Sequence, residues 1–229
     1  MFSHVNFDGL FSLFIFCIEI LFILNLLYFA NRNRTNLIGL AMLTVLACYQ
    51  FIEFLICNQM IQSPTIAYFA FVDISFLPPF GLMLSLSLNN KLKKVHLLAF
   101  VPALTLLIYY AGMIETFKVV RCSFFYAMYH YPFGDLYGFI YYIPVILTLI
   151  IFTLGIKNNI DPEKIFFNKV LLTGYLLFVI PSIIAFIVYP EFWRMVESVM
   201  CKFAFLFACC VSYFILKNGR LRKEIKVVF

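Results

Sequence analysis

The stretch Glu197–Leu216, ESVMCKFAFLFACCVSYFIL, has the length of a membrane-spanning helix and carries a lysine inside it. A helix needs about 20 apolar residues to cross the hydrocarbon core of a bilayer. Lys202 lies about 10 Å along the span that includes this stretch, at a rise of about 1.5 Å per residue. The stretch predicts a membrane helix whose lysine needs a partner from another helix.

The composition of the whole chain also indicates a membrane protein. Of its 229 residues, 64% are hydrophobic and only 12% are charged. A soluble domain is about 45–50% apolar and about 25% charged. A water-soluble fold of this size has too little interior to hide so much apolar surface. We therefore expect the chain to be embedded in a lipid bilayer.

The hydrophobic pattern predicts an all-α, polytopic bundle of seven transmembrane helices. Apolar runs of sufficient length recur along the sequence and leave only short polar connections. We expect one transmembrane domain over 1–229 that ends in a short basic cytoplasmic tail at 217–229. The predicted spans are 9–30, 37–57, 65–88, 97–113, 136–156, 170–189 and 195–216.

The basic residues predict an orientation. Most of the 17 lysines and arginines lie in the loops near 31–36, 89–96 and 157–169 or in the tail. Positive residues favour the cytoplasmic side of a membrane. The N-terminus is therefore expected outside and the C-terminus inside, which requires an odd number of spans. The predicted location is the cell membrane, either plasma or inner, with several passes.

Four charged residues fall inside the predicted spans: Glu19, Glu53, Asp73 and Lys202. Charges at membrane depth are costly and usually face the protein interior or a wet cavity. The depths of Glu53, Asp73 and Lys202 place them in one outer layer. We therefore expect Glu53 and Asp73 to be the partners of the Lys202 ammonium group.

Other polar residues repeat at helical spacing near this layer. Gln50, Glu53 and Cys57 follow an i, i+3, i+7 pattern, and Tyr137 and Tyr141 follow an i, i+4 pattern. These patterns predict an outward-facing pocket that binds a small ligand or lipid without catalysis, with the aromatic loop 114–135 at its rim. The predicted ligand-binding residues are Gln50, Glu53, Asp73, Cys201, Lys202, Tyr137 and Tyr141, with Glu19 and Glu197 as further polar candidates.

Prolines inside the spans favour such a pocket. Pro78 and Pro79, Pro102, Pro144 and Pro181 each fall within a predicted helix. A proline in a helix removes a backbone hydrogen bond and kinks the helix, which opens space beside it. Ordinary packing of membrane helices is the alternative reading of each proline.

Three other roles are compatible with the same residues. The Lys202 ion pair can simply fix the register of the helices. The intramembrane carboxylates can instead carry protons or cations in a small transporter or channel. A membrane enzyme acting on lipid is the third alternative, although no catalytic residues are predicted.

Several classes of site are disfavoured by what the sequence contains. The three histidines are His4, His96 and His130, and the topology places His96 on the side opposite the others, so a three-histidine zinc site is excluded. Lys202 is too shallow for a retinal Schiff base, and we expect no cofactor. The basic residues form no nucleic-acid-binding motif, so nucleic acid is not an expected partner, and no protein partner is indicated.

The cysteines allow one covalent link. Cys57 and Cys122 both fall on the predicted outer side. A disulfide between them is permitted in an oxidising compartment and would tie the loop 114–135 to the second helix.

Two motifs resemble those of known families. The segments CYQFIEFLICNQ and ESVMCKFAFLFACC resemble a bacterial family of seven-helix membrane proteins with no assigned activity. That family has Gln-x-x-Glu in its second helix, matched by Gln50 and Glu53, and Ser-x-Trp-Cys-aromatic in its seventh, matched by Ser198 and Cys201. Met200 and Lys202 depart from the motif. The span order and FVDISFLPPFGLMLSLSL are also similar to the seven-helix sensor regions of some histidine kinases, which implies a sensory role.

Overall fold

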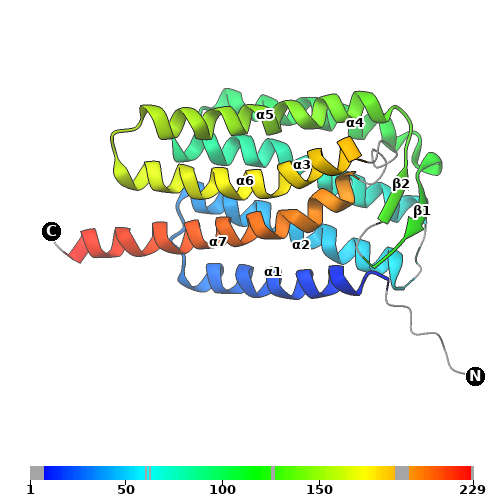
Figure 1. Ribbon diagram of the computed structural model, residues 1–229, viewed down its shortest axis with the longest axis horizontal. Helices are drawn as coiled ribbons and strands as arrows, with labels where there is room; N and C mark the ends of the chain where they lie inside the picture. The colour runs from blue at the N-terminus through cyan, green and yellow to red at the C-terminus, as the bar shows by residue number, and fades with distance from the viewer. Residues whose placement is uncertain (1–7, 60, 62, 125–126, 189–195, 228–229) are drawn as a thin grey trace, which may run out of the picture.

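The computed structural model in Figure 1 describes residues 8–227 apart from 60, 62, 125–126 and 189–195. Seven helices in this part of the chain are long and apolar enough to cross a membrane. The chain is thus a multi-pass membrane protein, as its composition predicted. The helices are α1 (Leu10–Phe29), α2 (Arg34–Cys57), α3 (Pro64–Leu88), α4 (Val101–Ala111, preceded by the 3₁₀ turn η1, Lys94–Phe100), α5 (Gly134–Asn158), α6 (Pro162–Val188) and α7 (Val196–Val227).

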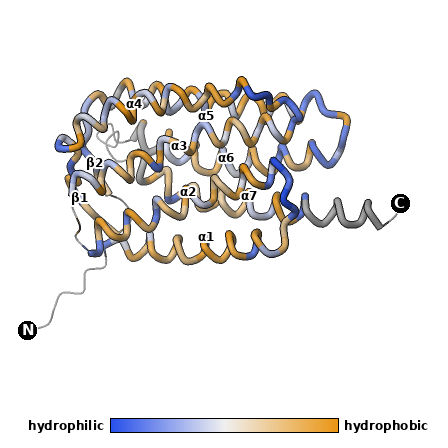
Figure 2. Tube along the Cα trace, turned by 180° about the vertical axis from the view of Figure 1, so that it is seen from behind, coloured by the Kyte–Doolittle hydropathy of each residue, from blue (hydrophilic) through white to orange (hydrophobic). Residues whose placement is uncertain are grey.

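The outer surface of the bundle is apolar along its length. Figure 2 shows hydrophobic segments along the helices and hydrophilic segments gathered at one end and in the connections. Large apolar side chains such as Phe14 and Ile108 are 61% and 75% exposed. A helix satisfies its backbone hydrogen bonds internally, so these faces can lie in lipid without cost.

Side-chain caps fix where several helices begin. Asn33 Oδ1 accepts a hydrogen bond from the backbone of Asn36 at the start of α2, and Asp161 Oδ1 accepts one from Glu163 at the start of α6. The sixth helix therefore begins at Pro162 and not at 170 as predicted. Proline is favoured in the first turn, and the polar residues that follow it hid this start from a hydropathy reading.

The fourth span differs from its prediction in shape. It starts as the 3₁₀ turn η1 at Lys94 and continues as α4 to Ala111, whereas the predicted span was 97–113. Pro102 lies in the first turn of α4, where a missing backbone N–H breaks no helical bond. The predicted kink inside this helix is therefore wrong, while Pro144 and Pro181 do lie inside α5 and α6.

The loop predicted at 114–135 contains a short β-hairpin at one end of the bundle. The turn η2 (Ile114–Thr116) leads into β1 (Lys118–Cys122), which pairs antiparallel with β2 (Ala127–His130). Cys122 forms a disulfide with Cys57 at the end of α2, with 5.4 Å between the two Cα atoms. The structure thus confirms the link between this loop and the second helix.

The seventh helix is longer than its predicted span. It continues to Val227, so most of the basic segment predicted as a tail from 217 is helical and extends beyond the other helices (Figure 1). The predicted end of the sixth span at 189 and start of the seventh at 195 lie outside the described residues.

Glycines bring α7 close to its neighbours. A Cβ atom on Gly174 of α6 would lie 2.8 Å from Cδ2 of Phe207, and one on Gly39 of α2 would lie 2.9 Å from Cδ1 of Ile215. Small residues at such contacts let membrane helices approach closely. The residues of α7 that face α2 and α6 are therefore shielded from lipid.

Candidate functional site

Lys202 lies between three helices in a closed polar cluster. Its Nζ is 2.9 Å from Glu53 Oε1 and donates hydrogen bonds to Ser12 Oγ and Gln50 Oε1, both at 2.7 Å. Ser12 comes from α1, and Gln50 and Glu53 come from α2. We call Ser12, Gln50, Glu53 and Lys202 the ammonium cluster. It joins α1, α2 and α7 in the half of the bundle that carries the hairpin.

The ammonium group has no donor left for another molecule. A lysine ammonium has three N–H donors, and the three acceptors of the cluster take one each. Gln50 is itself held in place, because its Nε2 donates to the Cys201 carbonyl oxygen at 3.0 Å. Ser12 and Gln50 are fully buried, and Lys202 is 8% exposed. This arrangement stabilises a helix contact and needs no ligand to complete it.

The sequence predicted part of this cluster. Gln50 and Glu53 are both on the face of α2 that meets Lys202, as their i, i+3 spacing implied. Ser12 was missed, since a lone serine in an apolar run carries no signal of its own. Its spacing of seven residues from Glu19 was the available clue: both lie on the buried face of α1.

Asp73 does not pair with Lys202, which corrects the prediction. The described residues give Lys202 its ion pair with Glu53, while Asp73 Oδ2 is buried and has no hydrogen-bond partner among them. Depth along a span does not determine the direction in which a residue faces. The backbone carbonyl of Cys201 takes part in the cluster through Gln50, and its thiol is buried.

Glu19 is a second buried carboxylate, and it forms no ion pair with the side chains that the structure describes. It is fully buried on α1, and neither carboxylate oxygen has a hydrogen-bond partner in the described part of the chain. It lies about 10 Å along the helix from Ser12, at about 1.5 Å per residue. Glu197 lies in the first turn of α7, and its side chain is outside the described residues.

Tyr137 and Tyr141 lie at a different place from the ammonium cluster. They line a cavity of about 350 Å³ between α3, α4 and α5, which we call the lateral cavity. The Ser75 hydroxyl donates to Tyr137 Oη at 3.4 Å at this cavity, and the remaining walls are almost entirely apolar. The predicted single pocket is therefore divided: the charged residues form a closed contact, and the tyrosines line open space.

The prolines explain much of that space. Pro78 and Pro79 of α3, Pro102 of α4 and Pro144 of α5 all line the lateral cavity. A proline ring is compact and fills less of the gap than a larger side chain would. The prolines inside α3 and α5 also remove a backbone hydrogen bond from their helices. The sequence reading that prolines open space near a pocket agrees with this position.

A small void lies beside the lateral cavity, on the side of α7. It measures about 20 Å³ and is lined by Cys201 and Met200 of α7 together with Tyr141 and Pro78. Tyr141 and Pro78 line the lateral cavity as well, so they form the partition between that cavity and the α7 residues next to Lys202.

Metal binding has no support in the described residues. Within them, no three His, Cys, Asp or Glu side chains gather closely enough to hold an ion. No family model, curated protein or solved structure matches this chain.

Proposed function

We propose that this membrane protein binds a lipid chain or another elongated apolar molecule in the lateral cavity, without catalysis. The main support for this proposal is the cavity of about 350 Å³ with apolar walls between three membrane-spanning segments. An apolar cavity of roughly 150 Å³ already binds benzene. Twice that volume, in a position surrounded by acyl chains, suits a hydrocarbon tail.

The chemistry of the walls limits the ligand. The lining residues carry three hydroxyl groups, those of Ser75, Tyr137 and Tyr141, all neutral, and the first two are hydrogen-bonded to each other. A charged group in the cavity would lack a counter-charge, which is costly in apolar surroundings. The preferred ligand therefore has a long apolar part and at most one neutral polar group that reaches these hydroxyls.

Sensing would use the partition formed by Tyr141 and Pro78. A ligand that displaces the Tyr141 ring would push it into the void beside Cys201. The Cys201 carbonyl oxygen accepts a hydrogen bond from Gln50 of the ammonium cluster, so a movement of α7 at this point would reach the cluster. The ligand shifts the helix packing only if it binds two packings with different affinity. The ammonium cluster stabilises the packing without ligand, and the free energy of ligand binding must exceed this stabilisation before the helices shift.

The orientation belongs to the same proposal. We place the N-terminus and the hairpin outside and the C-terminus in the cytoplasm of a plasma or inner membrane. The distribution of basic residues supports this orientation. The Cys57–Cys122 disulfide at the hairpin end is a second support, because disulfides persist in oxidising compartments.

Photo-crosslinking tests the binding site. The protein is reconstituted in liposomes with a phosphatidylcholine that carries a diazirine on its acyl chain, and labelled residues are mapped by mass spectrometry. We expect labelling to concentrate on the walls of the lateral cavity and to fall when Ala103→Phe fills it. Ile108→Phe on the lipid-facing side of α4 is the matched control. Labelling spread evenly over all lipid-facing helices would refute the proposal.

Proton or cation movement is the second candidate, and Glu19 favours it. A fully buried carboxylate with no hydrogen-bond partner in the described residues is typical of groups that exchange protons in membrane proteins. Liposomes with an internal pH dye and an imposed gradient separate the two candidates. Binding alone predicts no dissipation of the gradient. Dissipation that Glu53→Gln or Glu19→Gln abolishes would instead establish transport.

A further inference from the structure

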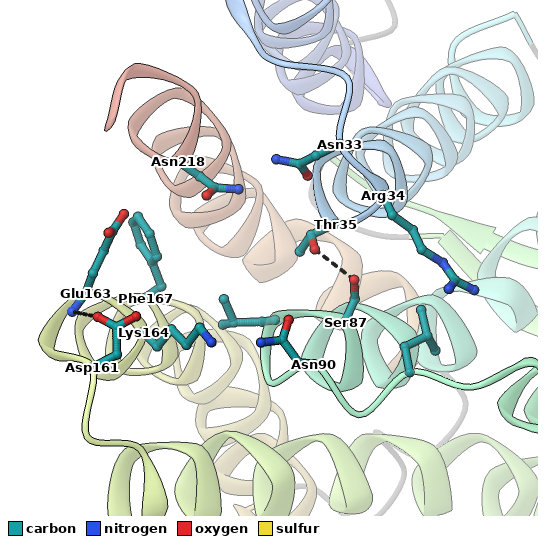
Figure 3. A pocket seen from close by; sticks show the side chains of 12 residues that line it. Asn33, Arg34, Thr35, Ser87, Asn90, Asp161, Glu163, Lys164, Phe167 and Asn218 are labelled. Carbon is teal, nitrogen blue, oxygen red and sulfur yellow. Dashed lines mark hydrogen bonds between the residues drawn. The ribbon is translucent and has the colours of Figure 1, made fainter. Parts of the chain in front are cut away.

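A polar cavity of about 610 Å³ lies at the end of the bundle opposite the hairpin. Figure 3 shows it between the start of α2, the end of α3, the start of α6 and α7. We call it the end cavity. It is lined by charged and amide side chains together with a few apolar ones, and it shares no residue with the lateral cavity or the ammonium cluster.

The end cavity is held open by polar links between helices. Thr35 and Ser87 share a hydrogen bond of 2.8 Å that joins α2 to α3, drawn as a dashed line in Figure 3. Asn218 Nδ2 donates to Asn36 Oδ1 at 2.8 Å and joins α7 to α2. Binding sites that are formed in advance lose little free energy to ordering when a ligand arrives.

Four charges of both signs line the end cavity. Arg34 and Lys164 are positive, and Asp161 and Glu163 are negative. None of the four forms an ion pair among the side chains that the structure describes. In Figure 3 the Lys164 side chain points inward from α6, and Glu163 rises at the rim beside Phe167. A purely anionic ligand would face both carboxylates, and a purely cationic ligand would face Arg34 and Lys164.

We propose that the end cavity binds a zwitterionic phosphoethanolamine group, with its phosphate at Lys164 and its primary ammonium at Glu163. Basic side chains form strong charge-assisted hydrogen bonds to phosphate, and basic pockets between membrane helices on the cytoplasmic side bind lipid headgroups. A primary ammonium has N–H donors for a carboxylate, whereas choline has none. Leu88, Leu92 and Phe167 give an apolar wall for the first carbons of the acyl chains of a lipid.

The group can come from phosphatidylethanolamine or from free O-phosphoethanolamine, and native mass spectrometry with a thermal shift separates the two. Protein from bilayers of equal phosphatidylethanolamine, phosphatidylcholine and phosphatidylglycerol is released from detergent, and its retained lipids are counted. Retention of phosphatidylethanolamine over the other two supports a lipid source. A rise in melting temperature with millimolar O-phosphoethanolamine, in phosphatidylcholine alone, supports a free source.

Matched variants complete the test. Lys164→Gln and Glu163→Gln should each reduce about tenfold the lipid preference or the affinity for O-phosphoethanolamine, which is read from the ligand concentration needed for a given thermal shift. Lys169→Gln, on the same helix but exposed and outside the cavity, should leave both unchanged. Equal retention of the three lipids with no thermal shift, preference for phosphatidylglycerol, or equal effects of Lys164→Gln and Lys169→Gln would overturn the proposal.

Discussion

The contact of α1, α2 and α7 and the space between α3, α4 and α5 differ in how they treat polarity and volume. The first holds an ammonium group whose three donors are all used by protein acceptors. The second holds about 350 Å³ of open space with almost no polar atoms. In a membrane, a buried charge must be fully satisfied by the protein, whereas an apolar cavity can exchange its contents with lipid. The charged residues of α1, α2 and α7 therefore close a helix contact, and the apolar residues of α3, α4 and α5 leave space between helices.

Removing the Glu53 charge should have the largest effect on stability. Glu53→Gln leaves the Lys202 ammonium without its counter-charge in a buried site, at a cost of about 3–5 kcal/mol in the free energy of unfolding. Unfolding in mixed micelles with increasing SDS measures this loss. The double variant Glu53→Leu with Lys202→Met should recover most of it, and the exposed Glu115→Gln is the control. A loss no larger than that of Glu115→Gln would show that the cluster does not hold the helices.

Breaking the disulfide tests whether the hairpin supports this helix contact. Cys122→Ser should lower the free energy of unfolding by about 2–4 kcal/mol, since the bond closes a long loop between α2 and β1. The same SDS titration measures the loss, and a reducing agent should reproduce it in the unmodified protein. Cys17→Ser, at an exposed free cysteine, should change nothing. An unchanged titration for Cys122→Ser would show that the link to the hairpin does not stabilise the protein.

Removing the Ser12 hydroxyl should have a smaller effect. Ser12→Ala takes away one of three acceptors of Lys202 but leaves the ion pair, at an expected cost of about 1.5–3 kcal/mol. Thr105→Ala is a suitable control, because its exposed hydroxyl bonds only to its own helix. Equal melting temperatures for the two variants would mean that α1 is not anchored through Lys202.

Filling the lateral cavity should have the smallest effect on stability and the clearest effect on binding. Ala103→Phe adds a ring where space exists, so we expect the free energy of unfolding to change by less than about 1.5 kcal/mol. The loss of photo-labelling described above should occur nonetheless. A large loss of stability would show that the space is needed for packing and not for a ligand.

The sequence predicted the helix contact around Lys202 better than the open space, for physical reasons. A lysine in hydrocarbon demands partners, so Lys202 led to Glu53 and Gln50 from depth and spacing alone. The same reasoning wrongly paired Asp73 with Lys202, because the direction of the Asp73 side chain depends on the orientation of α3 about its own axis, which depth does not determine. The hairpin strands were missed because each is only a few residues long.

The lateral cavity was not predictable from sequence. It depends on how α4 packs against α3 and α5, and apolar residues on those helices fit either a tight contact or a gap. Tyr137 and Tyr141 line this cavity and not the contact around Lys202, so their assignment to the same pocket as Lys202 was wrong. The end cavity was missed because its charges come from two separate helix starts, Arg34 at α2 and Asp161, Glu163 and Lys164 at α6, each of which resembles an ordinary polar boundary in the sequence.

A side-chain-resolution density map of the protein in lipid nanodiscs would show what occupies each of the two regions. We expect elongated density between α3, α4 and α5, in contact with Tyr137 and Tyr141, and no added density at Lys202, whose ammonium should touch Ser12, Gln50 and Glu53. A ligand bound to Lys202, with the space between α3, α4 and α5 closed by side chains, would contradict it.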